Sequence, residues 1–302
     1  MTTTKEPSGL LPGVLAFSIW GLVPIYFKLL DSVPSLEVLG HRVFWSVLLL
    51  LPLLKFTGQL SQLKTVFTNP KVLGLLMLSS ILIAGNWLTF IWGVANDRIL
   101  ETSLGYFINP LLNIFLGYLF LSEKLSPLKM IAVGIAAFAV VLQIWLLGSI
   151  PWVAFAVAGT FGFYGLLRKH IPVAAATGLT VETILLLPAT LGYFFWLYQT
   201  GDYSFSFDTP QLSLLLALAG LVTTVPLVLF NVAAKRLTLT SVGILQYLGP
   251  SISFLVGVFI FGEEVNQARI ITFGLIWLAL AIFTWDSYRT LKAKTSTQAA
   301  GS

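Results

Sequence analysis

The sequence predicts an all-α integral membrane protein with ten transmembrane helices that form two inverted five-helix repeats. Composition is the first observation: 57% of the 302 residues are hydrophobic and only 10% are charged, a balance that soluble domains of this length do not show. The second is a series of ten apolar stretches, each long enough to cross a bilayer core, which takes about 20 helical residues. The third is an internal repeat at half the chain length.

The repeat pairs Thr102–Trp145 with Thr240–Trp285. In each copy a Thr-Ser pair opens an apolar segment with a polar, proline-containing centre, and a short acidic turn leads into the next apolar segment. The same alignment places Glu123 of the first turn on Glu263 of the second. Self-similarity of this kind indicates a duplicated unit, and in membrane proteins such units pack around a shared site.

Five apolar stretches fall in each half of the chain. The connections between them are short, rich in Pro, Gly, Ser or charged residues, and too short to hold a further domain. We therefore expect a first repeat over residues 10–148, a second over 150–287 and a polar cytoplasmic tail over 288–302. The expected helices are Leu10–Leu30, Leu36–Leu54, Val72–Val94, Thr102–Leu121, Leu128–Leu147, Pro151–Leu167, Val173–Tyr198, Leu212–Ala233, Thr240–Phe261 and Ala268–Trp285.

Positive charge predicts the orientation of the chain. If the N-terminus is cytoplasmic, most of the 17 Lys and Arg residues fall in cytoplasmic segments, including Arg168 and Lys169 after the sixth expected helix. This asymmetry follows the positive-inside rule and places both termini in the cytoplasm. Since each repeat has an odd number of helices, the second half enters the membrane in the opposite orientation to the first.

Inverted repeats are typical of transporters. Two halves related by a two-fold axis in the membrane plane can exchange conformations and open a central site first to one side and then to the other. The sequence has no Gly-x-x-x-x-Gly-Lys loop to cradle a nucleotide, so we expect secondary transport by alternating access. It also has no cysteine, which excludes thiolate metal sites and thiol nucleophiles. We expect no metal and no cofactor.

Several short segments of the sequence together form a family pattern: Trp20-Gly21 with Tyr26, the run from Glu37 to Arg42 with Trp45-Ser46, Asn86-Trp87, the run from Leu104 to Pro110, Gln246-Tyr247, and the acidic turns at Glu123 and Glu263. These segments resemble the RarD branch of the drug/metabolite transporter superfamily, whose members carry tandem EamA domains. The resemblance covers about Leu10 to Ser287 and implies a ten-helix permease of the bacterial inner membrane. It also implies an association with chloramphenicol sensitivity, and relatives in the superfamily export amino acids, drugs or nucleotide sugars.

Four ionisable residues inside the expected spans are candidates for a charged pathway or gate: Glu37, His41, Arg42 and Glu182. An arginine at a helix centre costs roughly 2.5–3.5 kcal/mol, so it needs a partner or a water-filled route. Superposing the repeats places His41 opposite Glu182, and we expect Arg42 or His41 to face Glu182 across the repeat interface. The alternatives are structural ion pairs, a surface position for Glu37, and a proton-carrying role for His41.

Seven uncharged side chains form the candidate substrate-binding set. Those of the fourth expected helix recur at three- and four-residue spacing and therefore share one face. Amides and hydroxyls beside aromatic rings suit a small drug-like or amino-acid-like metabolite with an apolar body and a few polar groups. The alternative is that the amides hold helices together. The set comprises Asn86, Trp87, Tyr106, Asn109, Asn113, Gln246 and Tyr247.

The expected partners are a small-molecule substrate and the lipid bilayer, with protons or a counter-substrate as candidates for coupling. Nucleic acid is not expected, because the Lys and Arg residues do not form a basic face. Small residues in the fifth and tenth expected helices permit close contact within one chain or between two, which leaves both monomer and homodimer open.

Two alternatives to a transporter use the same charged cluster: an intramembrane enzyme and a channel. Glu123 and Glu263 belong to neither, because they lie in turns at the membrane surface. We expect them to cap the helices that follow, where a carboxylate stabilises the positive end of the helix dipole.

Overall fold

The computed structural model describes residues 9–95, 99–147, 151–262 and 267–300, and over these residues the chain is helical with no strand. Apolar periodic segments, ended by Gly, Pro and charged residues, account for this architecture. The helices are α1 (Leu10–Lys28), α2 (Ser35–Phe56), α3 (Leu60–Phe67), α4 (Pro70–Ala95), α5 (Ile99–Leu121), α6 (Pro127–Leu147), α7 (Trp152–His170), α8 (Ala175–Thr200), α9 (Pro210–Arg236), α10 (Leu239–Gln246), α11 (Leu248–Phe259) and α12 (Gln267–Ala300).

Among the described residues, eight helical segments are long and apolar enough to cross a membrane, and one of them, Leu239–Phe259, contains both α10 and α11. A shorter apolar segment, Ile270–Asp286, lies within α12. Helix α7 falls short because the last of its turns contains two basic residues and a histidine, which lower its mean hydropathy. The chain is therefore an all-helical, multi-pass membrane protein, and its hydropathy alone does not reach the expected ten spans.

Three elements differ from the expected spans. The connection after α2 contains a short helix, α3, whose Val66 is buried against α4 and α8. The ninth expected span is divided into α10 and α11 at Tyr247, three residues before Pro250, whose ring is incompatible with a regular ladder to the preceding turn. Helix α12 continues to Ala300 and thus includes most of the segment expected as a tail.

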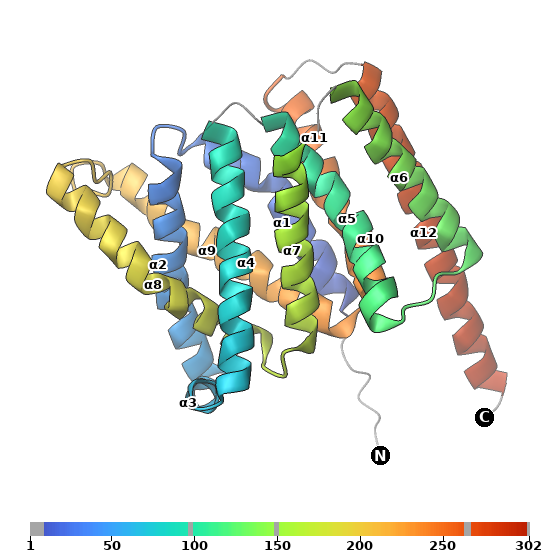
Figure 1. Ribbon diagram of the computed structural model, residues 1–302, viewed down its shortest axis with the longest axis horizontal. Coiled ribbons are helices and arrows are strands. Elements are labelled where there is room, and N and C mark those ends of the chain that lie inside the picture. Colours follow the sequence, from blue (N-terminus) through green and yellow to red (C-terminus); the bar gives the residue numbers. More distant parts are fainter. Residues whose placement is uncertain (1–8, 96–98, 148–150, 263–266, 301–302) are drawn as a thin grey trace.

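The long helices cross the molecule in alternating directions (Figure 1). Helix α1 starts on the side where α12 ends, and we call this side the N-terminal side. Helix α1 runs away from that side, whereas α7, the first long helix of the second half, runs toward it (Figure 1). The α1–α2 and α8–α9 connections both lie on the opposite side, which we call the far side.

The two halves of the chain pack mainly against each other. Helix α1 contacts α9 and α11, and α7 contacts α4 and α5. Helix α2 packs against α8 and α9, α5 against α10, and α6 against α12. Contacts within one half, such as α4 with α5 and α8 with α9, are less extensive. A core of this kind, shared between halves, positions side chains from both halves around common sites.

An aromatic cluster fills the interface between the halves. The fully buried Phe230 of α9 lies 6.0 Å from Phe17, 5.7 Å from Trp20 and 5.1 Å from Phe161, measured between ring centres. The tilted and edge-on geometries are those that aromatic rings favour. Because α1, α7 and α9 all contribute rings, this cluster holds α1 of the first half against α7 and α9 of the second.

Candidate functional site

Arg42 extends from α2 between helices of both halves. Its Nε donates a hydrogen bond of 2.8 Å to Thr223 Oγ1 on α9. Its guanidinium carbon lies 4.7 Å from the centre of the Trp87 ring and 5.7 Å from that of Phe27, a distance at which a cation is attracted to an aromatic face. The side chain is half-buried, and no carboxylate of the described residues forms an ion pair with it.

Tyr106 lies on the same side of the molecule as Arg42. The tyrosine comes from α5, is 45% exposed, and is close enough to interact electrostatically with the guanidinium. The Tyr106 ring lies 6.0 Å from that of Phe90 on α4. The structure thus brings together, around one arginine, two residues that the sequence singled out as substrate-binding candidates, Trp87 and Tyr106. We call Phe27, Arg42, Trp87, Tyr106 and Thr223 the Arg42 site.

Glu37 and His41 lie nearer the far side and hold the α8–α9 loop. The fully buried Glu37 carboxylate accepts hydrogen bonds from Ser204 N at 2.7 Å and Ser204 Oγ at 2.8 Å. His41 Nε2 lies 3.9 Å from the Glu37 carboxylate, and its ring stacks on Tyr203 at 5.8 Å. Burial, and secondarily the charge of Glu37, raises the pKa of Tyr203 in this loop. Glu37 is therefore an internal anchor and does not reach the surface.

Glu182 belongs to a different cluster, at the N-terminal side. Both Glu182 and Arg168 are fully buried, and Arg168 Nη1 lies 3.5 Å from Glu182 Oε1. The carboxylate also accepts hydrogen bonds from Ser79 Oγ at 2.5 Å and from the Tyr164 hydroxyl at 3.3 Å. Three helices, α4, α7 and α8, are joined by one carboxylate.

Arg168 Nη1 faces Glu182 through the ion pair and makes no hydrogen bond to the described residues, whereas the other two nitrogens of the guanidinium do. Arg168 Nε donates to Asn231 Oδ1 on α9 at 3.2 Å, and Nη2 donates to the Ala175 carbonyl at 3.0 Å. Gly178 on α8 provides the space, since a Cβ there would fall on the guanidinium. An ion pair with this many hydrogen bonds is the arrangement that a buried charge requires.

The expectation that Arg42 or His41 faces Glu182 is therefore wrong. Glu182 pairs with Arg168, which the sequence had placed in a cytoplasmic connection. Arg168 lies in the last turn of α7, and its long side chain folds back into the bundle to reach the carboxylate. Arg42 and Glu182 each lie seven residues after the start of a helix, but α2 starts on the far side and α8 on the N-terminal side. The two charges therefore belong to opposite ends of the molecule.

Three of the uncharged candidates form a buried amide cluster between α5 and α10. Asn109 Nδ2 donates to the Ala158 carbonyl of α7 at 2.7 Å, and its Oδ1 accepts from Gln246 Nε2 at 2.6 Å. Asn113 Nδ2 donates to Asn109 Oδ1 at 3.1 Å and to Gln246 Oε1. Asn113 Oδ1 is buried and has no hydrogen-bond partner among the described residues. The cluster thus ties the two halves together and retains one free acceptor.

The remaining uncharged candidates also bridge the two halves. Asn86 Nδ2 on α4 donates to the Val157 carbonyl at 2.8 Å and to Thr160 Oγ1 at 3.1 Å, both on α7. The hydroxyl of the fully buried Tyr247 donates to the Phe107 carbonyl at 3.3 Å. Of the seven uncharged candidates, Trp87 and Tyr106 are the two that contact or approach a charged group through their rings or hydroxyls.

Glu123 caps a helix, but not the one that follows it. Its carboxylate accepts hydrogen bonds from Leu239 N at 2.6 Å and from Thr240 N and Oγ1 at 2.9 and 2.6 Å. These groups form the start of α10, so the carboxylate satisfies free N–H groups of a helix from the other half. The equivalent Glu263 lies outside the described residues.

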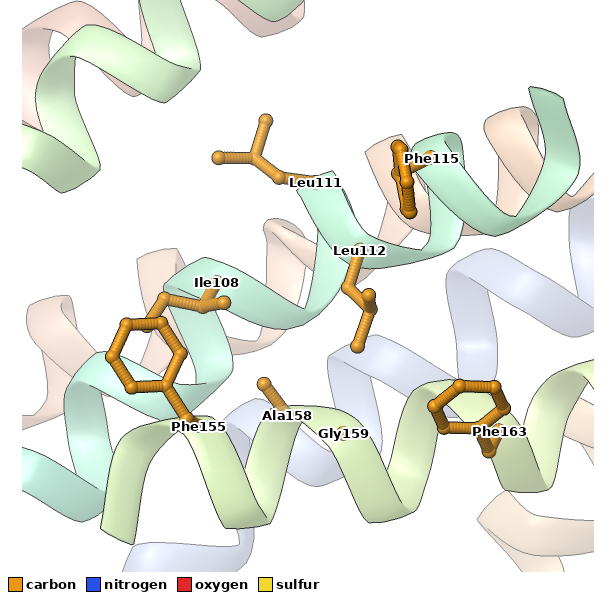
Figure 2. Close-up of a pocket in the computed structure, with 8 residues that line it drawn as sticks. All are labelled: Ile108, Leu111, Leu112, Phe115, Phe155, Ala158, Gly159 and Phe163. Atoms are coloured by element: carbon orange, nitrogen blue, oxygen red, sulfur yellow. The ribbon is translucent and has the colours of Figure 1, made fainter. Parts of the chain in front are cut away.

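A groove of about 440 Å³ lies between α5 and α7 (Figure 2). Aromatic and aliphatic side chains line it, and three of them are exposed: Phe115, Phe155 and Phe163. Figure 2 shows Leu112 and Ala158 pointing into the space between the two helices. An apolar groove on a membrane helix pair suits hydrocarbon rather than a polar ligand.

Comparison with known proteins gives a consistent result. Residues 7–145 match the model of the "EamA-like transporter family". The chain is 47% identical over 281 residues to an "Uncharacterized transporter" of Vibrio cholerae, with 93% of each chain covered. It is 44% identical to "Protein RarD" of Escherichia coli K12, covering 96% of this chain and 98% of the relative.

A more distant relative carries a more specific name. The "Chloramphenicol-sensitive protein RarD" of Pseudomonas aeruginosa is 34% identical, with 94% of this chain and 96% of the relative covered. Among solved structures, one described as "Crystal structure of protein" superposes with a TM-score of 0.68 at 17% identity. It covers 91% of this chain and 96% of its own, so the two share a fold over nearly their whole lengths.

Proposed function

We propose that this chain, which belongs to the EamA-like transporter family and to its RarD branch within the drug/metabolite transporter superfamily, is a secondary transporter. Its substrate is a small drug-like or amino-acid-like metabolite, moved by alternating access between two inverted five-helix repeats. In this proposal α1, α2, α4, α5 and α6 form the first repeat. Helices α7, α8 and α9, the α10–α11 pair and α12 form the second.

The pairing of helices between the halves carries the proposal. A two-fold axis that exchanges the halves turns a contact between the first helix of one repeat and the fourth of the other into its counterpart. The contact of α1 with α11 and that of α7 with α5 form such a pair. The contacts of α1 with α9 and of α7 with α4, between the first helix of one repeat and the third of the other, form a second pair. The contacts of α2 with α8, α5 with α10 and α6 with α12 are each their own counterpart. The opposite directions of α1 and α7 (Figure 1) support the inverted orientation of the two repeats.

The different state of the two ends supports alternating access. At the N-terminal side, Arg168 and Glu182 lock α4, α7, α8 and α9 together with no exposed side-chain surface. At the far side, Arg42 and Tyr106 retain accessible surface. In an alternating-access cycle the closed network would open as the Arg42 site closes, which is the exchange expected of inverted repeats.

We further propose that the N-terminal side faces the cytoplasm of a bacterial inner membrane. The basic residues of α7 and α9 that support this, Arg168, Lys169, Lys235 and Arg236, lie at the ends of their helices, as the positive-inside rule requires. Lys169 and Lys235 also bind backbone carbonyls at that end, where cations stabilise a helix C-terminus.

The substrate route proposed here runs from the Arg42 site toward the amide cluster of Asn109, Asn113 and Gln246. The free Asn113 Oδ1 provides an acceptor at its inner end. Asn86 and Tyr247 position α4 against α7 and α10 against α5. Glu37 and His41 control the far-side loop, and Glu182 closes the N-terminal side.

Counterflow in sealed proteoliposomes tests the transport function. Unlabelled substrate on one side of the membrane should accelerate the entry of labelled substrate from the other, because a carrier must return through its second conformation. A channel gives no acceleration, and an enzyme gives conversion without accumulation. A thermal-stability screen of the purified protein against metabolites and antibiotics supplies the substrates, since a ligand that binds the folded state raises its apparent stability.

A further inference from the structure

The Arg42 side chain lies within a helix of the bundle and has no carboxylate partner among the described residues. Its Nε is bonded to Thr223, and its guanidinium carbon lies over the rings of Trp87 and Phe27. Neither Nη atom has a hydrogen-bond partner among the described residues. The side chain is half-buried rather than fully buried. Among the described residues, no protein group is hydrogen-bonded to the outer edge of the guanidinium.

A cation in this position needs an anion. Arginine at a helix centre costs roughly 2.5–3.5 kcal/mol on the most lenient scale, and intramembrane charges are usually paired. Arg168 meets this requirement with Glu182 at 3.5 Å. Arg42 has no carboxylate partner in the described part of the chain, and its neighbours are rings and hydroxyls.

The geometry selects the kind of anion. Because Nε is bonded to Thr223, the two Nη groups remain as a planar pair of donors. Such a fork matches the two oxygens of a carboxylate and gives two parallel charge-assisted hydrogen bonds. Thr223 is itself buried, so the fork is held in one orientation before any ligand arrives, which reduces the entropy lost on binding.

The surroundings select the body of the ligand. Trp87, Phe27 and, one step further, Phe90 beside Tyr106 provide aromatic faces around the charge. Tyr106, a residue that is 45% exposed, adds one neutral hydroxyl group. Apolar walls with a few fixed polar groups are the usual composition of a site for a small organic molecule.

We infer that the Arg42 site binds the carboxylate of a small organic acid that has an aromatic or apolar body, with the guanidinium as the anion-binding group. This inference deepens the proposed transport function and depends on it for its physiological meaning. Binding itself requires only the folded protein, so the two can fail separately. Counterflow tests transport, and the equilibrium measurement below tests the anion site.

The test uses purified protein in a maltoside detergent and compares phenylacetate with its neutral isostere phenylacetamide at constant ionic strength. Phenylacetate should raise the melting temperature in a saturable manner, whereas phenylacetamide should not, because it has no charge for the guanidinium. The Arg42→Lys variant keeps the charge but loses the planar fork, and its apparent affinity should fall about tenfold. Thr223→Val keeps the arginine but frees its Nε, and should weaken binding several-fold.

Arg289→Gln is the matched control, because it removes the same charge from an exposed position on α12. This control should bind phenylacetate like the unmodified chain. If phenylacetate and phenylacetamide give the same shift, or if the shift survives in Arg42→Lys and Thr223→Val, the inference is wrong. It is also wrong if phosphatidylglycerol added to the micelles gives the only Arg42-dependent shift, because the anion is then a lipid phosphate.

Discussion

Arg168 and Arg42 lie at opposite ends of one helix bundle, and their positive charges are stabilised by different kinds of partner. Arg168 has no exposed surface and uses a carboxylate, an amide and a carbonyl from within the chain. Arg42 keeps accessible surface and uses one hydroxyl and two aromatic faces. A buried arginine with a carboxylate partner stabilises the closed structure, whereas an arginine without one is available to a ligand.

Removing one partner of the Arg168–Glu182 ion pair should have the largest effect on stability. Glu182→Gln leaves the Arg168 charge buried without its counter-charge, and we expect a loss of about 3–5 kcal/mol in the free energy of unfolding. Denaturant unfolding in detergent measures this. The double variant Arg168→Met with Glu182→Leu removes both charges and should recover most of the loss. A loss below about 1 kcal/mol in the single variant would contradict the view that Arg168 depends on Glu182.

Overpacking against the Arg168–Glu182 ion pair should have an intermediate effect on stability. Gly178→Ala places a methyl group on the Arg168 guanidinium, and overpacking of this kind typically destabilises by about 1–3 kcal/mol. Gly192→Ala on the same helix is the matched control, because a Cβ there meets no atom within 4 Å. That control should be neutral or gain up to about 1 kcal/mol from helix propensity. Equal melting temperatures for the two variants would show that the space at Gly178 is not needed.

Neutralising Arg42 should have the smallest effect on stability. Arg42→Gln loses a cation–π interaction of about 0.5–2 kcal/mol and a hydrogen bond to a charged group of about 1.5–3 kcal/mol. It also removes a charge that costs roughly 2.5–3.5 kcal/mol inside a membrane helix. These contributions offset each other, so unfolding should change by no more than about 1 kcal/mol while counterflow is lost. A stability loss as large as that of Glu182→Gln would place Arg42 among the structural charges.

The fold class and the family could be predicted from the sequence, whereas the partner of Glu182 could not. Composition and apolar periodicity predicted the all-helical membrane fold, and the short motifs predicted the family, because both signals are local. The partner of Glu182 was missed because a lysine or arginine at a helix end reads as part of a loop. Whether Arg168 turns outward or folds back into the bundle depends on the space left by Gly178 of another helix, and no local signal reports it.

The division of one expected span shows the same limit. The ninth span was expected to be one helix from Thr240 to Phe261, but α10 ends at Gln246, four residues before Pro250. Pro110 occupies the equivalent place in α5, yet that helix is continuous from Ile99 to Leu121. Glu123 likewise was expected to cap its own following helix, but the start of α10 lies against it in space. Which N–H groups a carboxylate reaches is decided by tertiary packing.

Reciprocal cysteine labelling tests the central claim, that the two ends of the molecule open alternately, most directly. The chain has no cysteine of its own, so Tyr106→Cys reports on the Arg42 end and Ser80→Cys on the Glu182 end without background. With a membrane-impermeant maleimide, Tyr106→Cys should react and Ser80→Cys should be protected. Adding the paired changes Arg168→Met and Glu182→Leu to each, which remove the ion pair without leaving a buried charge, should reverse the two reactivities together. A background of these paired changes in which both cysteines react, or in which Ser80→Cys gains reactivity while Tyr106→Cys keeps its own, would contradict alternating access.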